Sequence, residues 1–350
     1  MDRSAIEAEV RRLAPWYYSW DLCGVRTDAT PPCDDQGHRE VFCPPIHDGF
    51  WCGKSVLDVG CNEGAYGFGA LEHGARRLVG FDCRAVNVEK ARFIARLRSH
   101  DNAEFSVQSC DSWIRAHGDR LFDVVMMCGI LYHLTDPQET IRQYCRIARE
   151  WICVTSCVVG SDEGGFTVTP EANNIAASDG GHDSLMPNGA MTLIGEFRKH
   201  GFEPVHVSET RRADFFDGVS LLLRNCNGLC SAPEPLDVDR DEVAVYAAPA
   251  LAPGARSIEL FGAMYNLLGR PHRVRARVSW RHRGGRDETI AQEVLDLAPR
   301  SLKPGDPDSA STDRRLALTG EGDGVEIEIR DVKDGALVGG VHLPLVRPRS

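Results

Sequence analysis

Short runs of strand-forming residues alternate with longer helix-forming runs between Ser55 and Arg224. This alternation is typical of a parallel sheet whose strands are joined by crossover helices. The predicted strands are Ser55–Gly60, Leu78–Asp82, Ala103–Gln108, Phe122–Cys128, Trp151–Cys157, Pro204–Ser208 and Val219–Arg224. The helices predicted among them are Val86–Arg98, Pro137–Arg149 and Gly189–His200, the last closed by Gly201. The chain is therefore expected to contain a seven-stranded α/β core.

The pattern changes after Arg224. Residues 225–242 are rich in Cys, Pro, Asp and Gly, which suits a linker. Short alternating runs follow, separated by glycine-rich turns, and strands of this kind predict an antiparallel, sandwich-like all-β domain. They are Ser257–Phe261, Arg273–Trp280, Glu288–Leu295, Arg315–Leu318, Val325–Ile329 and Leu337–Val346.

Four parts make up the predicted domain organisation. They are an N-terminal helical and aromatic segment at 1–50, the α/β core at 51–228, a linker at 229–242 and a β-rich domain at 243–350. The length of 350 residues exceeds the usual ~100–150 residues of one domain, which supports more than one folding unit.

The sequence VLDVGCNEG at Val56–Gly64 is an apolar strand that runs into a turn with glycine at both ends. Gly60 leaves space for a ligand near the backbone, and Gly64 lets the next helix pack close to the strand. Asn62 stands where a third glycine would be expected, and asparagine tolerates a positive φ. The spacing is not G-x-G-x-x-G, and Asp58 would repel a pyrophosphate, so a dinucleotide is disfavoured. A strand followed by a glycine turn also occurs in many α/β folds.

One acidic residue and one short polar segment lie where an adenosyl ligand would need polar groups. Asp82 ends the next strand, about 20 residues beyond the turn, where a carboxylate can accept hydrogen bonds from ribose hydroxyls. Its alternative role is to cap the helix that starts near Val86. Residues 109–113, SCDSW, follow the third strand and could reach adenine, with Trp113 either stacking on the ring or packing in the core.

Taken together, VLDVGCNEG, GFD and FDVVMMCGILYHLTDP resemble a class I S-adenosylmethionine-dependent methyltransferase. GILYHLTDP is similar to the branch that includes the tRNA wobble-uridine carboxymethyltransferases and related small-molecule methyltransferases. The segments WYYSWD at 16–21 and SLMP at 184–187 extend the likeness, which covers about Trp16 to Arg224 and leaves out the C-terminal ~110 residues. The resemblance implies a Rossmann-like seven-stranded methyltransferase core.

The resemblance also implies S-adenosyl-L-methionine as the cofactor and gives roles to individual residues. The turn would line the methionine part, Asp82 the ribose and the segment after the third strand the adenine, while Cys128 and Gly129 would lie beside the methyl group. The predicted cofactor-binding residues are Asp58, Gly60, Cys61, Asn62, Gly64, Asp82, Cys110, Asp111, Ser112, Trp113, Cys128 and Gly129.

Methyl transfer mainly requires that the nucleophile be held near the methyl carbon, and a hydroxyl acceptor is helped by a base. His133 is the first candidate for that base, and Tyr132 could orient the substrate, although a lone histidine is more often structural. Further candidate substrate contacts are Trp16, Tyr17, Tyr18, Trp20 and His182. The aromatic group among these could form a lid, or it could merely anchor the N-terminal helix.

Composition narrows the classes of protein. The 13 cysteines all lie between Cys23 and Cys230 and no export signal precedes them, which predicts reduced thiols, a cytoplasmic location and no membrane span. No metal is expected, because Cys33, His38, Cys43 and His47 have irregular spacing. The formal charge of −11 counts against nucleic acid as the main partner, although a basic face could still exist.

Three functions therefore remain open. The leading one is methyl transfer to an O or N nucleophile of a small molecule, a natural-product intermediate or a modified peptide. The first alternative is a tRNA wobble-uridine (carboxy)methyltransferase, whose carboxylated cofactor needs a cation, and residues 42–55 contain only Lys54 as a lysine. The second alternative is a catalytically idle binding module. The β-rich domain could cover the site, form a homodimer or bind a partner.

Overall fold

In the computed structural model of the chain, most residues are described. The described residues are 1–28, 49–161, 163–170, 183–210, 217–226, 234–251, 258–268, 270–282, 287–298, 309–310, 312–318 and 324–345. The chain divides into two compact units, the first of Met1–Cys157 with Gly165–Pro187 and the second of Val158–Gly164 with Asn188–Ser350. This division runs differently from the predicted domain boundaries.

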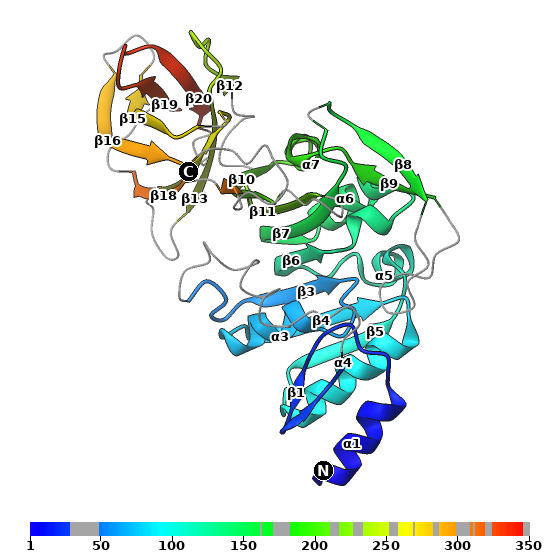
Figure 1. Cartoon of the computed structure of the whole chain (residues 1–350). Coiled ribbons are helices and arrows are strands. Elements are labelled where there is room, and N and C mark those ends of the chain that lie inside the picture. Colours follow the sequence, from blue (N-terminus) through cyan, green and yellow to red (C-terminus); the bar gives the residue numbers. More distant parts are fainter. Residues whose placement is uncertain are drawn as a thin grey trace. The chain divides into compact units, whose positions relative to one another are not determined.

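A parallel sheet forms the centre of the first unit (Figure 1). Its strands are β3 (Ser55–Val59), β4 (Arg77–Asp82), β5 (Ala103–Val107), β6 (Phe122–Cys128) and β7 (Ala148–Val158). They run side by side in the order β7-β6-β3-β4-β5, and every neighbouring pair is parallel. The chain leaves β3 toward β4 and later returns to β6 on its other side, so the topological switch point lies between β3 and β6. Ligands bind open α/β sheets at the carboxyl ends of such strands.

Helices follow the first four of these strands. They are α3 (Ala65–Glu72), α4 (Ala85–Leu97), α5 (Cys110–His117) and α6 (Pro137–Cys145). The Asp136 carboxylate accepts a hydrogen bond from the Glu139 N–H at 2.9 Å and so caps α6, with Pro137 at its first position, as predicted. The predicted end of this helix at Arg149 is wrong, because β7 begins at Ala148 and pairs there with β6.

Two hairpins of the first unit were not predicted, whereas a helical N-terminal segment was. The N-terminal segment forms α1 (Arg3–Arg12) and a short hairpin of β1 (Asp21–Leu22) and β2 (Val25–Arg26). It lies beside α4 (Figure 1). A second hairpin of β8 (Phe166–Pro170) and β9 (Asp183–Pro187) contacts η1 (Leu131–His133), the short 3₁₀ turn after β6.

The second unit begins with the remaining elements of the predicted core. They are α7 (Ala190–Arg198), β10 (Phe202–Thr210) and β11 (Asp217–Asn225), and the two strands pair antiparallel. Gly201 has φ +80°, which fits its predicted role as a left-handed cap. With β10 and β11, all seven strands predicted for the α/β core are present, as in a Rossmann-like methyltransferase fold. These two strands group with the second unit, in which β10 contacts strands of the β-rich domain.

The rest of the second unit is a two-sheet antiparallel sandwich. One sheet has the order β12 (Glu234–Pro235), β20 (Leu337–Pro344), β19 (Gly324–Asp331), β15 (His272–Arg281) and β16 (Glu288–Leu297). The other has the order β13 (Val243–Leu251), β14 (Ile258–Asn266) and β18 (Thr312–Ala317). Side chains from both sheets share one buried core, so the all-β prediction is confirmed.

The sequence reasoning missed two strands of this sandwich. It left out β13, whose run VAVYAAPAL contains a proline and four alanines and so has weak strand character. It also placed β12 in the linker, although Glu234 pairs with His342 of β20. No helix among the described residues is long and apolar enough to cross a membrane. The described cysteines are free, whereas Cys33, His38, Cys43 and His47 lie outside the described residues.

Candidate active site

The glycine turn after β3 is held in one conformation by backbone contacts. Gly60, Asn62 and Gly64 have φ values of +67°, +48° and +86°. The Cys61 N–H donates to the Phe81 carbonyl at 2.8 Å, which ties the turn to β4. The left-handed φ of Gly60 favours glycine, and a Cβ atom added there would lie 2.8 Å from Ile130 Cδ1, which would have to shift. The predicted turn geometry, including the positive φ of Asn62, is confirmed.

Asp58 lies beneath this turn and is almost completely buried. Its carboxylate accepts a hydrogen bond from the Gly67 N–H at 3.2 Å, in the first turn of α3. Burial raises the pKa of Asp58 to about 7, and the charge of Asp82 adds to the rise. Partners that carry positive charge would favour its ionised form. Its predicted contact with the cofactor's methionine part stays a prediction.

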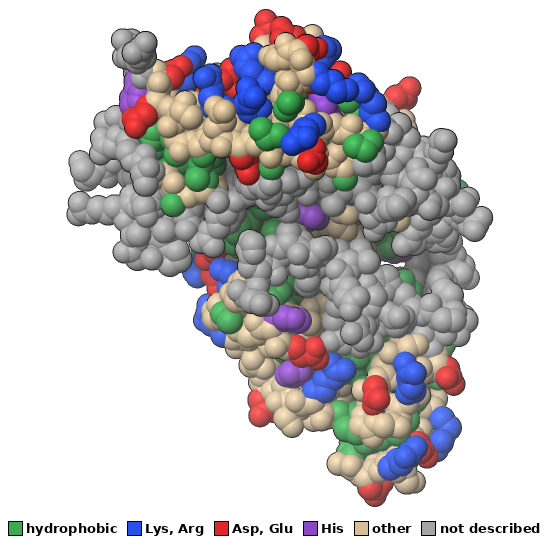
Figure 2. All heavy atoms as spheres, turned by 60° about the vertical axis from the view of Figure 1, so that its left-hand side comes forward, with side chains coloured by type: hydrophobic (Ala, Val, Ile, Leu, Met, Phe, Trp, Pro, Cys, Tyr) green, Lys and Arg blue, Asp and Glu red, His purple; other side chains and the backbone are tan. Residues whose placement is uncertain are grey.

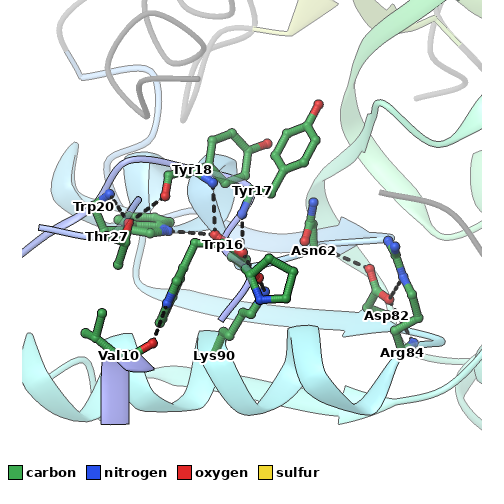
Figure 3. Close-up of polar contacts among 12 residues, drawn as sticks. Val10, Trp16, Tyr17, Tyr18, Trp20, Thr27, Asn62, Asp82, Arg84 and Lys90 are labelled. Atoms are coloured by element: carbon green, nitrogen blue, oxygen red, sulfur yellow. Dashed lines mark hydrogen bonds and ion pairs between the residues drawn. The ribbon is translucent and has the colours of Figure 1, made fainter. Parts of the chain in front are cut away.

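Asp82 ends β4 with both carboxylate oxygens engaged. One oxygen accepts from the Asn62 N–H at 3.0 Å, and the other accepts from the Arg84 N–H at 2.8 Å (Figure 3). The Arg84 side chain lies 3.5 Å from the same carboxylate. Arg84 is the N-cap of α4, so the capping alternative accounts for part of this geometry. The carboxylate thus holds the turn and the start of α4 together at the predicted ribose position.

The segment after β5 begins α5 with a reciprocal capping box. The Ser109 and Ser112 hydroxyls each accept from the other residue's N–H, at 3.2 and 2.9 Å. Trp113 is fully buried, and its ring stacks on Phe81 with centroids 5.2 Å apart. Core packing, one of the two roles left open for Trp113, is accounted for by these contacts. Asp111 is exposed, and burial raises the pKa of the Cys110 thiol to about 12.

The predicted methyl end lies at the carboxyl end of β6. Cys128 is buried there, and Gly129 follows with φ +75°, its N–H donating to the Thr155 carbonyl at 2.8 Å. Tyr132 and His133 follow in η1, with ring centroids 4.2 Å apart. The Tyr132 hydroxyl lies 3.5 Å from the position of a Cβ atom on Gly129. The structure therefore brings Tyr132 to the predicted methyl end.

A group of phenols surrounds Tyr132. Burial raises the pKa of the Tyr132 phenol well above its ordinary value. The neighbouring groups that add to this rise are Cys157, Tyr17 and Tyr66. Tyr132 is thus a neutral hydrogen-bond donor at physiological pH. The sequence reasoning missed Tyr66, which follows the glycine turn by two residues and could have been found from that position.

The N-terminal aromatic residues differ from one another. Trp16, Tyr18 and Trp20 are buried, and the Trp16 Nε1–H donates to the Val10 carbonyl at 2.9 Å. These contacts are those of an anchor. Tyr17 is only partly buried, and its ring points away from α4 (Figure 3). His182, the remaining candidate, lies outside the described residues.

A buried ion pair behind the turn also escaped the sequence reasoning. Glu63 Oε1 and Lys90 Nζ are 2.9 Å apart, and their side chains are 0% and 2% exposed. The signal available was a glutamate inside the glycine turn, but its partner stands 27 residues later on another helix.

Comparisons with known proteins show what part of this chain is similar to. A family model described as a methyltransferase domain matches residues 52–178. The tRNA U34 carboxymethyltransferase of Helicobacter pylori (strain G27) is 34% identical over 135 residues, covering 38% of this chain and 50% of that protein. The corresponding protein of Helicobacter acinonychis (strain Sheeba) is 35% identical over 143 residues, covering 41% and 53%. The chain spans about half the length of these curated relatives.

A solved structure shares the fold. The crystal structure of the N-terminal domain of EvdMO1, determined in the presence of SAH and D-fucose, has a TM-score of 0.54 and 20% sequence identity. The match covers 64% of this chain and 97% of that domain. The chain carries a methyltransferase domain of the class I, S-adenosylmethionine-dependent type, and this domain resembles that of the tRNA U34 carboxymethyltransferases.

Proposed function

We propose that the protein binds S-adenosylmethionine and transfers its methyl group to an oxygen or nitrogen nucleophile of a small molecule or modified peptide. The observation that carries this proposal is the rigid turn at Gly60–Gly64 together with the Asp82 carboxylate at the end of β4. A glycine-bounded turn beside a fixed acid suits an adenosyl ligand. The methyltransferase-domain match over residues 52–178 supports the same ligand.

The residues present fit this cofactor. Gly60, Asn62 and Gly64 hold the backbone of the turn at positive φ, and Asp82 offers a carboxylate at the ribose position. The Thr155 hydroxyl, beside the Gly129 backbone, is a buried polar atom with no hydrogen-bond partner among the described residues. When bound, S-adenosylmethionine supplies a methyl group on a sulfonium, which a nucleophile can take up directly. Asp58 would lie at its methionine part and Asp82 at its ribose, and Gly129 would lie beside its methyl group.

The side chains near Gly129 would act on the acceptor. The neutral Tyr132 phenol can donate a hydrogen bond to an acceptor oxygen and hold its lone pair toward the methyl position. His133 can remove the proton of an acceptor hydroxyl, since an imidazole titrates near neutral pH. Phenols suit a hydroxyl-bearing or planar acceptor, because they combine an apolar face with a polar tip.

A second candidate function is carboxymethyl transfer to the wobble uridine of tRNA. The named relatives at 34–35% identity favour it. A carboxylated cofactor would need a cation near Gly129, whereas the side chains named there are phenols, a thiol and His133. Lys54, the lysine considered from the sequence, pairs with Glu150 at 2.9 Å. These observations support ordinary S-adenosylmethionine.

Calorimetry with S-adenosylmethionine and S-adenosylhomocysteine tests the proposal. We expect micromolar binding, about −8 kcal/mol, and an Asp119→Asn control on an exposed turn should bind equally well. Transfer of a labelled methyl group from S-adenosylmethionine to hydroxylated small molecules and peptides, compared with transfer of a labelled carboxymethyl group from the carboxylated cofactor to total tRNA, then separates the two functions. Label in tRNA alone would replace the first candidate by the second. A protein that binds neither ligand would be the catalytically idle module.

A further inference from the structure

Glu63 lies inside the glycine turn, yet its side chain is fully buried. The carboxylate pairs with Lys90 of α4. A buried ion pair is weak evidence for stability, since desolvation of both charges offsets their attraction. Stability alone therefore does not explain why the charges are buried, and the other groups that the carboxylate binds have to be considered.

The other partners of Glu63 all belong to the N-terminal segment Trp16–Trp20. Oε1 accepts from the Tyr17 N–H at 2.7 Å. Oε2 accepts from the Tyr18 N–H at 3.2 Å and from the Trp20 indole N–H at 2.9 Å (Figure 3). With Lys90 this makes four donors, which uses the lone-pair capacity of a carboxylate.

Lys90 binds the same segment from the other side. Its ammonium donates to the Pro15 carbonyl and lies 5.3 Å from the centre of the Trp16 ring. Glu63 of the turn and Lys90 of α4 thus both bind the N-terminal segment around Trp16–Trp20. The aromatic residue of this segment that remains partly exposed is Tyr17, whose phenol interacts with that of Tyr132.

We infer that Glu63 is a positioning residue that couples the cofactor turn to Trp16–Trp20, so that it holds Tyr17 beside Tyr132 at the acceptor end of the site. The inference rests on the proposed function, because it takes the turn as the cofactor site. A turn that carries a buried charge cannot shift without moving the donors bound to that charge, since separating them would leave an unpaired ion in the interior. Cofactor binding on the turn therefore tightens the segment.

Hydrogen exchange of the Tyr17 and Tyr18 amides measures this coupling, because both donate directly to Glu63. Saturating S-adenosylhomocysteine should slow their exchange by about tenfold in the unaltered protein. The amide of Arg275, on strand β15 of the sandwich at an exposed position, serves as an internal reference and should not change.

Two variants weaken the hydrogen bonds between the Glu63 carboxylate and the N-terminal segment to different degrees. Glu63→Gln leaves one acceptor oxygen in place of two, so the slowing by S-adenosylhomocysteine should fall below about twofold and its Kd should rise about tenfold. Trp20→Phe removes a single donor and keeps the ion pair, so it folds even where Glu63→Gln does not, and we expect an intermediate loss of slowing. The matched control is Glu104→Gln, at an exposed glutamate paired with Arg77, which should behave like the unaltered protein.

The outcomes separate the two hypotheses. Failure of S-adenosylhomocysteine to bind would end both the proposed function and this inference. If calorimetry shows binding while the Tyr17 and Tyr18 amides exchange at an unchanged rate, the coupling is refuted and the proposed function stands. A Trp20→Phe variant with full ligand-dependent slowing would likewise refute the role of the carboxylate as the link.

Discussion

The parallel-sheet unit and the sandwich differ in the placement of two sets of charged side chains, buried around the glycine turn in the first and exposed on an outer face in the second. Asp58, Glu63 and Asp82 are all buried around a single turn of the first unit, each with specific N–H donors. On the sandwich, basic and acidic side chains are interspersed on an outer face (Figure 2). The pair of Arg273 and Asp296 there is 65% and 78% exposed. Water screens such a pair, whereas the buried carboxylates depend on their protein partners.

A partly buried charged cluster of the sandwich differs from the turn in composition. Glu242, His272 and Asp331 bring ligand atoms within 4.8 Å of one another. Arg240 pairs with Asp331 at 3.1 Å and with Glu242 at 3.2 Å. The guanidinium supplies the positive charge that the acids require, so ion pairing accounts for this arrangement.

The largest expected effect concerns the buried pair. Lys90→Met should lower the free energy of unfolding by about 3–5 kcal/mol, because it leaves the Glu63 carboxylate buried without its counter-charge. Denaturant unfolding followed by circular dichroism measures the change. A loss below about 1 kcal/mol would mean that the interior around Glu63 tolerates an unpaired charge, which would break the contrast with the sandwich.

The next effect is a pH dependence that originates at Asp58. Its pKa is about 7 in the fold and near 3.8 in the unfolded chain, so the folded protein binds the extra proton. Stability should therefore fall as the pH rises from about 4 to about 7, by up to about 4 kcal/mol, and stay level above that range. Asp58→Asn should flatten this part of the profile. An unchanged slope in the variant would assign the pH dependence to other groups.

A smaller effect is expected from Asp82→Asn. The amide keeps one acceptor oxygen but loses the charge, so S-adenosylhomocysteine should bind about 10–100 times more weakly, which corresponds to about 1.4–2.7 kcal/mol. Titration calorimetry gives the comparison, with Asp119→Asn as the exposed control. Equal affinity in both variants would remove Asp82 from the cofactor site.

The smallest effect should come from the exposed face of the sandwich. Arg273→Ala breaks an ion pair of 3.6 Å between well-exposed side chains, and we expect a change below about 0.5 kcal/mol in unfolding free energy. Affinity for S-adenosylhomocysteine should stay the same. A loss comparable to that of Lys90→Met would show that the two regions do not differ as described.

The fold was largely predictable because its signals are local. Strand β6 was predicted with its observed bounds, and the cap at Asp136 and the left-handed Gly201 follow from short-range backbone chemistry. The errors occurred where long-range packing decided the outcome. The helix α6 ends at Cys145 because the following residues pair with β6, and no local signal stops it there.

The site divides in the same way. The sequence by itself determined the glycine turn and the acids Asp58 and Asp82, because a ligand that approaches the backbone demands small residues at fixed spacing after a strand. Only the tertiary structure decided that Glu63 binds Lys90 and the Tyr17 amide, 27 and 46 residues away, and that Tyr17 lies near Tyr132. The physical reason is that these contacts depend on where separate elements pack, and a pattern of residue types along the chain carries no record of that placement.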